Sequence, residues 1–462
     1  MATTAPLPTV TEPEPLETDT HPAVTDEAPF LSTSHAVSPT LAAGEALEAR
    51  LRRGERVLPM AFGEAGVPAA HILRYALAAA SSHNGYGPVA GAEALREAAA
   101  GYWARRALPT SPDDVVCGPG SKALLYGLLL SLGGSGSGSG ICDVAVPRPS
   151  WVSYAAQASL TGVRPVYVPV PCGPGGVPAA GGVPDPGRLA DAASAARSEG
   201  RRIGAVIVTL PDNPTGTLAG AGVVRELCQV ARRHDMLIIS DEIYRDLAFD
   251  GPGAVTSPAS LAPERTVITS GLSKNLALGG WRLGVARLPS GLSGLRSALL
   301  ANGSEIWSAP AAPVQQAATL AFEELPDIRQ RVEVSRRLHG RITREVASRF
   351  AAAGALVAPP AGAFYLYPDF GPHRELLAGR YGVKTSADLA DLLLERYGIG
   401  VLPGSAFGDP DTALRIRVAT SRLYGDTASR QEAALAASNP AALPWIASSL
   451  DWIAESLTDL VS

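Results

Sequence analysis

Lysine is nearly absent from this chain of 462 residues. Only Lys122, Lys274 and Lys384 occur, so 36 of the 39 basic residues are arginines. Arginine stays protonated in proteins, whereas a desolvated lysine can lose its proton and attack a carbonyl group. Most lysines lie at the surface with the ammonium group in water. A lysine retained in a chain that otherwise uses arginine is therefore a candidate for chemistry.

Cysteine is also scarce, and charge of one sign does not dominate. The four cysteines are far apart and form no C-x-x-C pair. This spacing suits reduced thiols in a cytoplasmic protein better than a disulfide framework or a zinc site, and we expect no bound metal. The formal net charge is −5, from 39 basic and 44 acidic residues. We therefore expect no nucleic-acid partner.

Long apolar runs are missing as well. No run approaches the length that crosses a bilayer, and the N-terminus lacks the basic and apolar regions of a signal peptide. Residues 1–34 are rich in Thr, Pro and Glu, which predicts a disordered tail. The rest of the chain is long enough to bury a large core in two or three structural units. We expect a cytoplasmic globular protein that does not bind membranes.

Short apolar segments alternate with helical patterns from about residue 115 to 290. The runs 205–210 and 236–240 are continuously apolar, as in strands buried on both faces of a parallel sheet. A helical pattern over 221–234 separates them. This alternation predicts an α/β fold with a mostly parallel, doubly wound sheet, which binds its ligands at the strand ends.

Residues suited to chemistry follow these strands directly. They are Gly120 and Ser121 in a glycine turn before a helix, Trp151 in P-R-P-S-W, Asn213 in P-D-N-P-T-G, and Asp241 and Tyr244 in D-E-I-Y. The segment 266–286 reads T-V-I-T-S-G-L-S-K-N-L-A-L-G-G-W-R-L-G-V-A and contains Ser273, Lys274 and Arg282. Its β-branched start predicts a strand, and the Ser/Gly turn that follows holds the lysine.

This segment closely resembles the cofactor-lysine region of the class I and II aminotransferases, which are fold type I enzymes dependent on pyridoxal phosphate (PLP). About seven segments in the same order extend the resemblance over roughly residues 38–425. It implies a large PLP-binding domain with a mostly parallel sheet at 76–328 and a smaller α+β domain at 329–462. A helix and arm at 35–75 are expected to pack with the small domain.

The resemblance assigns roles to these residues around the cofactor ring. Lys274 carries PLP and shuttles the α-proton, and Asp241 faces the pyridine nitrogen. Tyr244 and Asn213 contact the ring oxygen, while Trp151 stacks on the ring. Taken singly, Asp241 also fits a helix cap and Tyr244 a core tyrosine. Their combination in this order favours the cofactor roles.

The phosphate group is assigned by resemblance to Arg282 and to the turn of Gly120 and Ser121, where helix N–H groups point at an anion. Relatives usually have a serine three residues before the lysine, and this chain has Gly271 there. Ser273 or Ser270 is expected to substitute. Lys122 follows the turn and fits a solvent-facing position.

Substrate and partner contacts also follow from the resemblance. Gly63 in an N-terminal arm lies over the substrate, and Asn213 also contacts it. Tyr86 in N-G-Y-G-P reaches the phosphate of the neighbouring subunit in a homodimer, or packs locally in its Gly/Pro turn. The strand alternation places Arg415 and Arg417 on one face, and either could clasp a carboxylate. The family alignment selects Arg415.

The resemblance thus predicts a PLP-dependent aminotransferase that moves an amino group between an L-amino acid and a 2-oxo acid by a ping-pong mechanism. An enzyme of the same fold that performs β-elimination or amine oxidation is the alternative. A regulator with an aminotransferase-like domain is a third reading. It would need a DNA-binding module, and residues 1–34 show neither a helix-turn-helix pattern nor a basic stripe.

Overall fold

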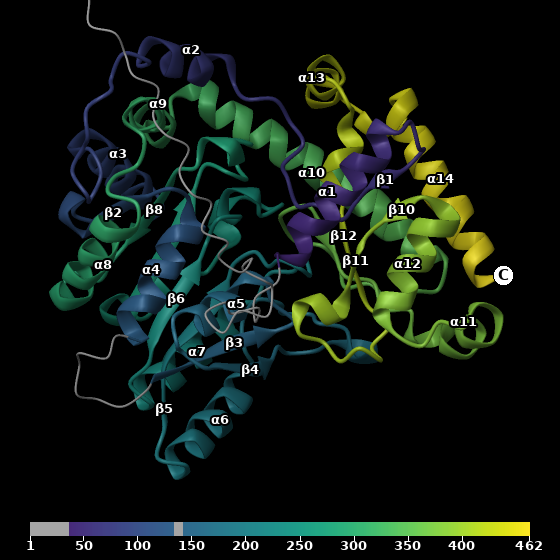
Figure 1. Ribbon diagram of the computed structural model, residues 1–462, viewed down its shortest axis with the longest axis horizontal. Coiled ribbons are helices and arrows are strands. Elements are labelled where there is room, and N and C mark those ends of the chain that lie inside the picture. Colours follow the sequence, from purple (N-terminus) through teal and green to yellow (C-terminus); the bar gives the residue numbers. More distant parts are fainter. Residues whose placement is uncertain (1–36, 134–141) are drawn as a thin grey trace, which may run out of the picture. The chain divides into compact units, whose positions relative to one another are not determined.

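The computed structural model describes residues 37–133 and 142–462, and Ser38–Ser462 form one compact unit. The prediction of a disordered tail at 1–34 lies outside the described residues. A seven-stranded sheet runs through this unit (Figure 1) in the order β2-β8-β7-β6-β5-β3-β4. The strands are β2 (Val115–Gly118), β3 (Cys142–Arg148), β4 (Pro165–Pro169), β5 (Arg202–Thr209), β6 (Leu237–Asp241), β7 (Thr266–Gly271) and β8 (Gly284–Arg287).

Most neighbouring strands of this sheet are parallel. The pairs β3-β4, β3-β5, β5-β6 and β6-β7 run in the same direction, whereas β8 is antiparallel to both β7 and β2. The mostly parallel α/β sheet agrees with the prediction. Because β8 lies antiparallel between β7 and β2, those two strands point the same way, and the start of β8 meets their carboxyl ends.

Helices cover both faces of the sheet because its central strands are apolar on both faces. Ala205 and Ile207 of β5 pack in one cluster with α4 (Ser121–Gly133), α5 (Ser153–Leu160) and α8 (Ser293–Ile306). Val206 and Val208 point the other way, toward α6 (Pro186–Ser198) and α7 (Ala221–Arg233). Each buried Val or Ile side chain contributes about 1.5–3 kcal/mol to folding. This continuous burial explains the unbroken apolar runs in the sequence.

A third cluster covers the β2-β8 half of the sheet with α2 (His71–Ala79), α3 (Glu93–Ala104) and α9 (Ala312–Glu323). The long α10 (Pro326–Ala352) then leads to a second group of elements. These are α11 (Arg374–Tyr381), α12 (Ser386–Tyr397), α13 (Ala428–Ala436), α14 (Pro444–Val461) and a small antiparallel sheet of β11 (Leu402–Pro403), β12 (Ile416–Ala419) and β9 (Tyr365–Leu366).

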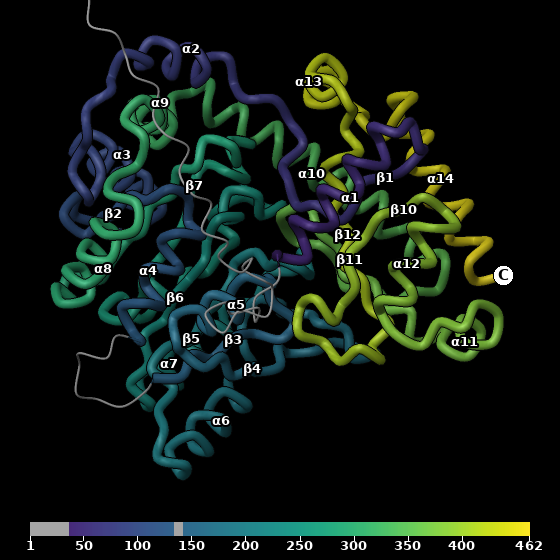
Figure 2. Tube along the Cα trace, in the orientation of Figure 1, coloured from purple at the N-terminus to yellow at the C-terminus, as the bar shows by residue number. Residues whose placement is uncertain are grey.

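The N-terminal arm belongs to the same core as this C-terminal group. After α1 (Pro39–Arg52), strand β1 (Leu58–Pro59) pairs in parallel with β10 (Ile399–Gly400), as the tube in Figure 2 shows. Leu58 and Met60 are buried in a cluster with side chains of α10, α12 and α14. The residues of the arm that follow β1 are thereby held next to β12. The proposed boundary at residues 328 and 329 remains a prediction.

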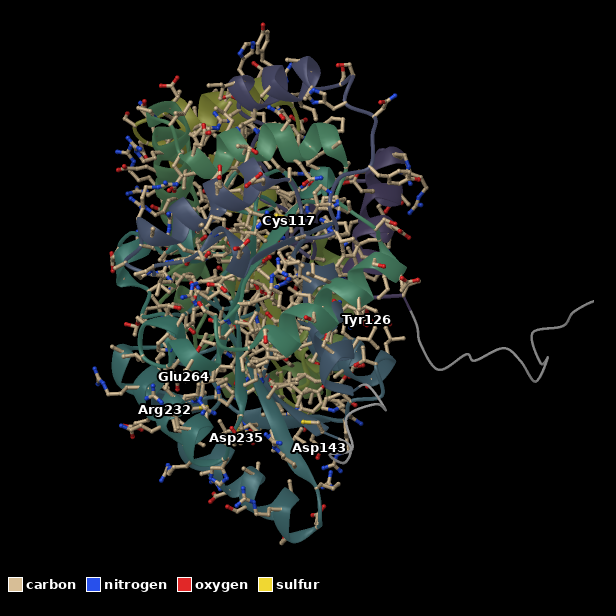
Figure 3. All side chains as sticks on the ribbon, turned by 90° about the vertical axis from the view of Figure 1, so that its left-hand side faces the viewer. Cys117, Tyr126, Asp143, Arg232, Asp235 and Glu264 are labelled. Atoms are coloured by element: carbon tan, nitrogen blue, oxygen red, sulfur yellow. The ribbon has the colours of Figure 1, made fainter. Side chains whose placement is uncertain are left out.

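Arginine–carboxylate pairs occupy the amino ends of the parallel strands, and Figure 3 labels several of the residues. Asp143 at the start of β3 is buried and accepts from Arg201 at 2.6 Å. Arg232 pairs with Glu264 just before β7, with Nε 2.9 Å from Oε1. The exposed Arg232–Glu264 pair contributes only about 0–1 kcal/mol, whereas the buried Asp143 keeps one oxygen, Oδ1, without a hydrogen-bond partner. Within the described ranges, no helix has both the length and the apolarity needed to cross a membrane.

Candidate active site

The opposite edge of the sheet carries a cavity of about 510 Å³. The carboxyl ends of β2, β3, β5, β6 and β7 meet there, together with the start of β8. Most predicted site residues line it, namely Gly63, Ser121, Trp151, Asn213, Asp241, Tyr244, Ser273, Lys274 and Arg282. Parallel strands that end in turns have thus brought together residues more than 200 positions apart.

Lys274 lies in the turn that follows β7. Its Nζ donates a hydrogen bond of 2.5 Å to the Gly63 carbonyl. Burial, with the positive charge of Arg417 nearby, lowers the pKa of Lys274 to about 8. The turn is anchored by the next residue, because Asn275 Nδ2 donates to Asp246 Oδ2 at 2.9 Å. A lysine held in this way can lose its proton near neutral pH and act as a nucleophile or base.

Asp241 is the last residue of β6 and is buried. Its Oδ2 accepts a hydrogen bond of 2.8 Å from the hydroxyl of Tyr154, and its Oδ1 accepts from the Ile243 N–H at 3.3 Å. Burial raises the pKa of Asp241 to about 6, and these hydrogen bonds oppose the rise. The carboxyl is therefore largely ionised at neutral pH and can hold a cationic N–H group inside the cavity.

Tyr244 follows β6 and lies against a second buried tyrosine. The hydroxyl oxygens of Tyr244 and Tyr365 are 2.8 Å apart, and the Tyr365 hydroxyl also lies 3.4 Å from the Gly63 carbonyl oxygen. A side chain at Gly63 would collide with the Tyr365 hydroxyl. The arm therefore needs a glycine at this position to approach the cavity so closely.

The opposite end of the cavity is built for an anion. Gly120 has φ +88°, and a Cβ there would collide with the guanidinium of Arg282. The next residue, Ser121, begins α4, whose first N–H groups and dipole attract negative charge. Gly120 itself shapes this turn without lining the cavity. Arg282 donates to the Gly279 carbonyl at 2.8 Å and to the Pro119 carbonyl at 3.4 Å, and it pairs with no carboxylate of the described residues.

The two arginines near β12 have different surroundings. Arg417 is buried, lines the cavity, and donates to the Ala61 carbonyl and to Asn213 Oδ1, the latter at 3.3 Å. Arg415 does not line the cavity. Its guanidinium is held by Asp369 Oδ2 at 2.8 Å and by Asp409 Oδ2 at 3.1 Å.

The selection of Arg415 for the substrate carboxylate remains a prediction, and the geometry of the cavity favours Arg417 instead. The predicted strand face is right, because Leu414, Ile416 and Val418 share one buried cluster and leave both arginines on the other side. One two-residue step along a strand is about 6.6 Å, which separates Arg415 from the cavity that Arg417 reaches. The carboxylates of Asp369 and Asp409 already compensate the positive charge of Arg415.

Tyr86 is 97% exposed and does not line the cavity of its own chain. It lies in the loop between α2 and α3. A contact with the phosphate site would require a second subunit. The role of Tyr86 remains a prediction.

Several residues of the cavity were not assigned roles from the sequence, among them Lys122, Tyr154 and Tyr365. No motif of the sequence marks Tyr154, which lies in the first turn of α5, three residues after Trp151. The rings of Trp151 and Tyr154 meet edge to face at 5.3 Å. Tyr365 belongs to the G-A-F-Y motif, but only the folded chain brings its hydroxyl to Tyr244.

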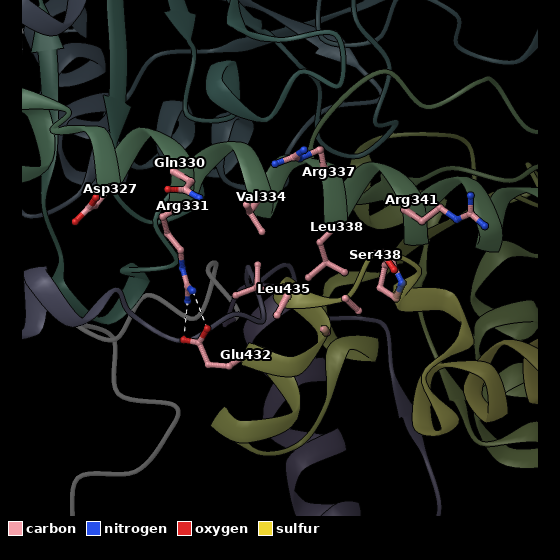
Figure 4. Close-up of a pocket in the computed structure, with 14 residues that line it drawn as sticks. Asp327, Gln330, Arg331, Val334, Arg337, Leu338, Arg341, Glu432, Leu435 and Ser438 are labelled. Atoms are coloured by element: carbon pink, nitrogen blue, oxygen red, sulfur yellow. Dashed lines mark hydrogen bonds and ion pairs between the residues drawn. The ribbon is translucent and has the colours of Figure 1, made fainter.

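A second cavity of about 650 Å³ lies between α10 and α13 (Figure 4). Arg331 pairs there with both oxygens of Glu432, at 2.8 and 3.1 Å. The lining contains no histidine, cysteine, tyrosine or lysine. Among the described residues, no cluster of three or more His, Cys, Asp or Glu side chains is arranged to hold a metal ion.

Comparison with known proteins places this site in a family. The sequence model of the family "Aminotransferase class I and II" matches residues 61–424. The aspartate aminotransferase of Geobacillus stearothermophilus is 34% identical over 394 residues, covering 83% of this chain and 92% of that protein. A probable aspartate/prephenate aminotransferase of Thermus aquaticus is 30% identical, with 78% and 87% covered. The solved aspartate aminotransferase of Thermus thermophilus with maleate has a TM-score of 0.74 at 26% identity, covering 91% of this chain and 97% of that one.

The fold and the cavity define an α/β transferase of fold type I. The chain belongs to the class I and II aminotransferases. The predicted fold class and enzyme class are confirmed by these relationships.

Proposed function

We propose that this aminotransferase uses PLP, held on Lys274, to move an amino group between an L-amino acid and a 2-oxo acid in two half-reactions of a ping-pong cycle. The observation that carries the proposal is the state of Arg417. Its guanidinium is buried beside the cavity, its Nε has no hydrogen-bond partner, and within the described parts of the chain it pairs with no carboxylate. A buried cation without a counter-ion is costly, so an anionic ligand is expected to complete it.

The donor set of the cavity fits PLP. Arg282 and the N-terminus of α4 suit its phosphate, and the indole of Trp151 offers a flat face to its ring. Asp241 suits the pyridine nitrogen, because a buried carboxylate favours a protonated partner. Bound PLP supplies an electron-withdrawing ring that weakens the Cα–H bond of an attached amino acid.

The chain's own residues then have separate tasks. Arg417 and Asn213 hold the α-carboxylate and so orient the Cα–H bond toward Lys274. Lys274, with its lowered pKa, takes up and returns that proton. Tyr154 keeps Asp241 in place through the 2.8 Å hydrogen bond to Oδ2. The narrow approach of the arm at Gly63 limits the access of water to these groups.

The proposal includes a homodimer in the cytoplasm. An exposed tyrosine such as Tyr86, in a loop rich in glycine, supports a contact with a second subunit. The four described cysteines are free, which supports a reducing compartment. Light scattering of the active protein tests the dimer, and a fully active monomer would contradict it.

The central experiment compares two arginine variants. The purified protein is supplied with PLP, a panel of amino acids beginning with aspartate, and a 2-oxo acid, and both products are measured. Arg417→Met should raise KM for the amino acid by about 30-fold or more, since losing one partner of a buried charge pair costs about 2–5 kcal/mol. Arg415→Met should lower the melting temperature and change KM little. The opposite pattern, or an absence of amino transfer with every amino acid, would contradict the proposal.

A further inference from the structure

Lys122 is a second lysine in the active-site cavity. It lies in the first turn of α4, next to Ser121, and both residues line the cavity together with Arg282. Its Nζ is 5.0 Å from the centre of the Trp151 ring, and the side chain is only half-exposed. The sequence had suggested a solvent-facing residue beside the glycine turn. The fold instead turns this scarce residue type inward.

The position of Lys122 is unfavourable for a cation without a ligand. No carboxylate of the described residues forms an ion pair with its ammonium group. Burial lowers the pKa of Lys122, and the positive charge of Arg282 lowers it further. Two neighbouring like charges in a cavity favour an anion between them. Lys274 and Arg417 already have roles in the proposed reaction. Lys122 lines the same cavity and has no role in that reaction.

A phosphate monoester is an anion whose charge fits these cations. It carries about −1.5 to −2 at pH 7. The guanidinium of Arg282 contributes one positive charge, and the N-terminus of a helix contributes about half a charge. Gly271 has no hydroxyl to add a donor, and the Ser273 hydroxyl that lines the cavity brings no charge. The contributions of Arg282 and the helix N-terminus give about +1.5, which falls short of a full dianion by about half a charge, and a second side-chain cation more than makes up the difference.

We propose that Lys122 binds the phosphate group of PLP and acts with Arg282 and the start of α4 as one dianion site. This inference rests on the proposed function, because it takes PLP as the cofactor. A carboxylate in the substrate side chain is the competing ligand for the same ammonium group. The phosphate is favoured because Lys122 lies in the first turn of α4, directly after Ser121, whereas Arg417, which contacts Asn213, is the cation assigned to the substrate carboxylate in the proposed function.

The test measures binding of PLP and of pyridoxal, which lacks the phosphate, to the cofactor-free protein. Lys122→Met removes the charge and keeps the length of the side chain. It should weaken PLP binding by about tenfold, near the lower end expected for a hydrogen bond to a charged group. Pyridoxal binding should not change. Lys122→Arg should retain PLP affinity, and Lys384→Met, at an exposed lysine, is the matched control.

Inorganic phosphate gives an independent readout. It should compete with PLP for the wild-type protein about tenfold more effectively than for Lys122→Met, and the salt dependence of PLP binding should decrease in the variant. Equal losses for PLP and pyridoxal would overturn the inference and assign Lys122 to the ring or to Trp151. Unchanged PLP binding with a raised KM for dicarboxylic substrates would overturn the inference and show that Lys122 binds the side-chain carboxylate of the substrate. If Arg282→Met weakens PLP binding and Lys122→Met does not, this inference fails while the proposed function stands.

Discussion

The hydroxyl groups of Tyr244 and Tyr365 lie 2.8 Å apart inside the cavity, on residues 121 positions apart in the chain. Tyr365 also reaches the Gly63 carbonyl, which accepts the hydrogen bond from Lys274. The proposed base, the arm and the tyrosine at the ring oxygen therefore share one small network. Tyr365 has one hydroxyl proton and can donate it either to the Gly63 carbonyl or to Tyr244, and Lys274 competes with it for that carbonyl.

Tyr365→Phe should lower kcat by about tenfold, because a buried hydroxyl left without its partner costs about 1–3 kcal/mol. The pH at which the absorbance of the bound cofactor changes should shift as well, since Tyr244 loses its neighbour. Tyr367→Phe is the matched control, because its hydroxyl contacts Asp409 at 3.1 Å in the Arg415 cluster. Equal effects in the two variants would show that Tyr365 has only a structural role.

Lys274→Ala should abolish covalent attachment of PLP and nearly all turnover. Borohydride reduction followed by peptide mass analysis should find the cofactor on Lys274 in the wild-type protein. Lys122 lines the same cavity and is the stringent internal comparison. Lys122→Met should still carry the reduced cofactor on Lys274 when PLP is saturating. A cofactor attached to Lys122 would refute the assignment.

Asp241→Asn should lower kcat by about 100- to 1,000-fold, the scale for loss of one preorganised electrostatic partner. The difference in stability between the wild-type protein and this variant should depend on pH. Burial raises the pKa of Asp241 to about 6, so the folded state favours its protonated form. Relative to the asparagine variant, the wild-type protein therefore loses stability as the pH rises through about 6.

Melting temperatures of the cofactor-free proteins at pH 5 and pH 8 check this sign. The melting temperature of the asparagine variant should rise relative to that of the wild-type protein from pH 5 to pH 8. If Asp241 only capped the turn toward Tyr244, asparagine would cap it nearly as well and turnover would stay normal. Near-normal turnover in a soluble variant would remove Asp241 from the mechanism.

The reactivity of Lys274 should depend on pH with a midpoint near 8. Burial and the charge of Arg417 lower its pKa, so the neutral, nucleophilic amine accumulates above that pH. Labelling of the cofactor-free protein with acetic anhydride, read out on the Lys274 peptide, should therefore rise through pH 8 and level off. Arg417→Met removes a like charge and should move the midpoint upward. A midpoint that stays in place would mean that burial alone sets the pKa.

Much of this site could be predicted from the sequence because it is built from strand ends. Asn213 and Asp241 directly follow continuously apolar strands, and parallel strands that end at one edge bring such residues together. The choice between Arg415 and Arg417 could not be made in the same way. Strand alternation treats the two alike, and the difference in their surroundings comes from Asp369, which lies 46 residues away and meets Arg415 only in the folded chain.

The hydroxyl partners were unpredictable for a similar reason. Tyr154 contacts Asp241 across 87 residues, and the pairing depends on β5 and β6 lying side by side. The inward turn of Lys122 follows from how α4 packs on the sheet, which no local pattern records.

The pairing of Leu58 with Ile399 has a consequence for the order in which this enzyme is made. The ribosome completes the arm early, but the strand and helices that hold it are translated more than 300 residues later. Domains fold as they emerge, so the sheet with Asp241 and Lys274 can form well before the arm has anything to pack against. Gly63 and Arg417 can take their places only after β10 and β12 have emerged. A nascent chain stalled within α12 would therefore contain the lysine but no completed substrate site.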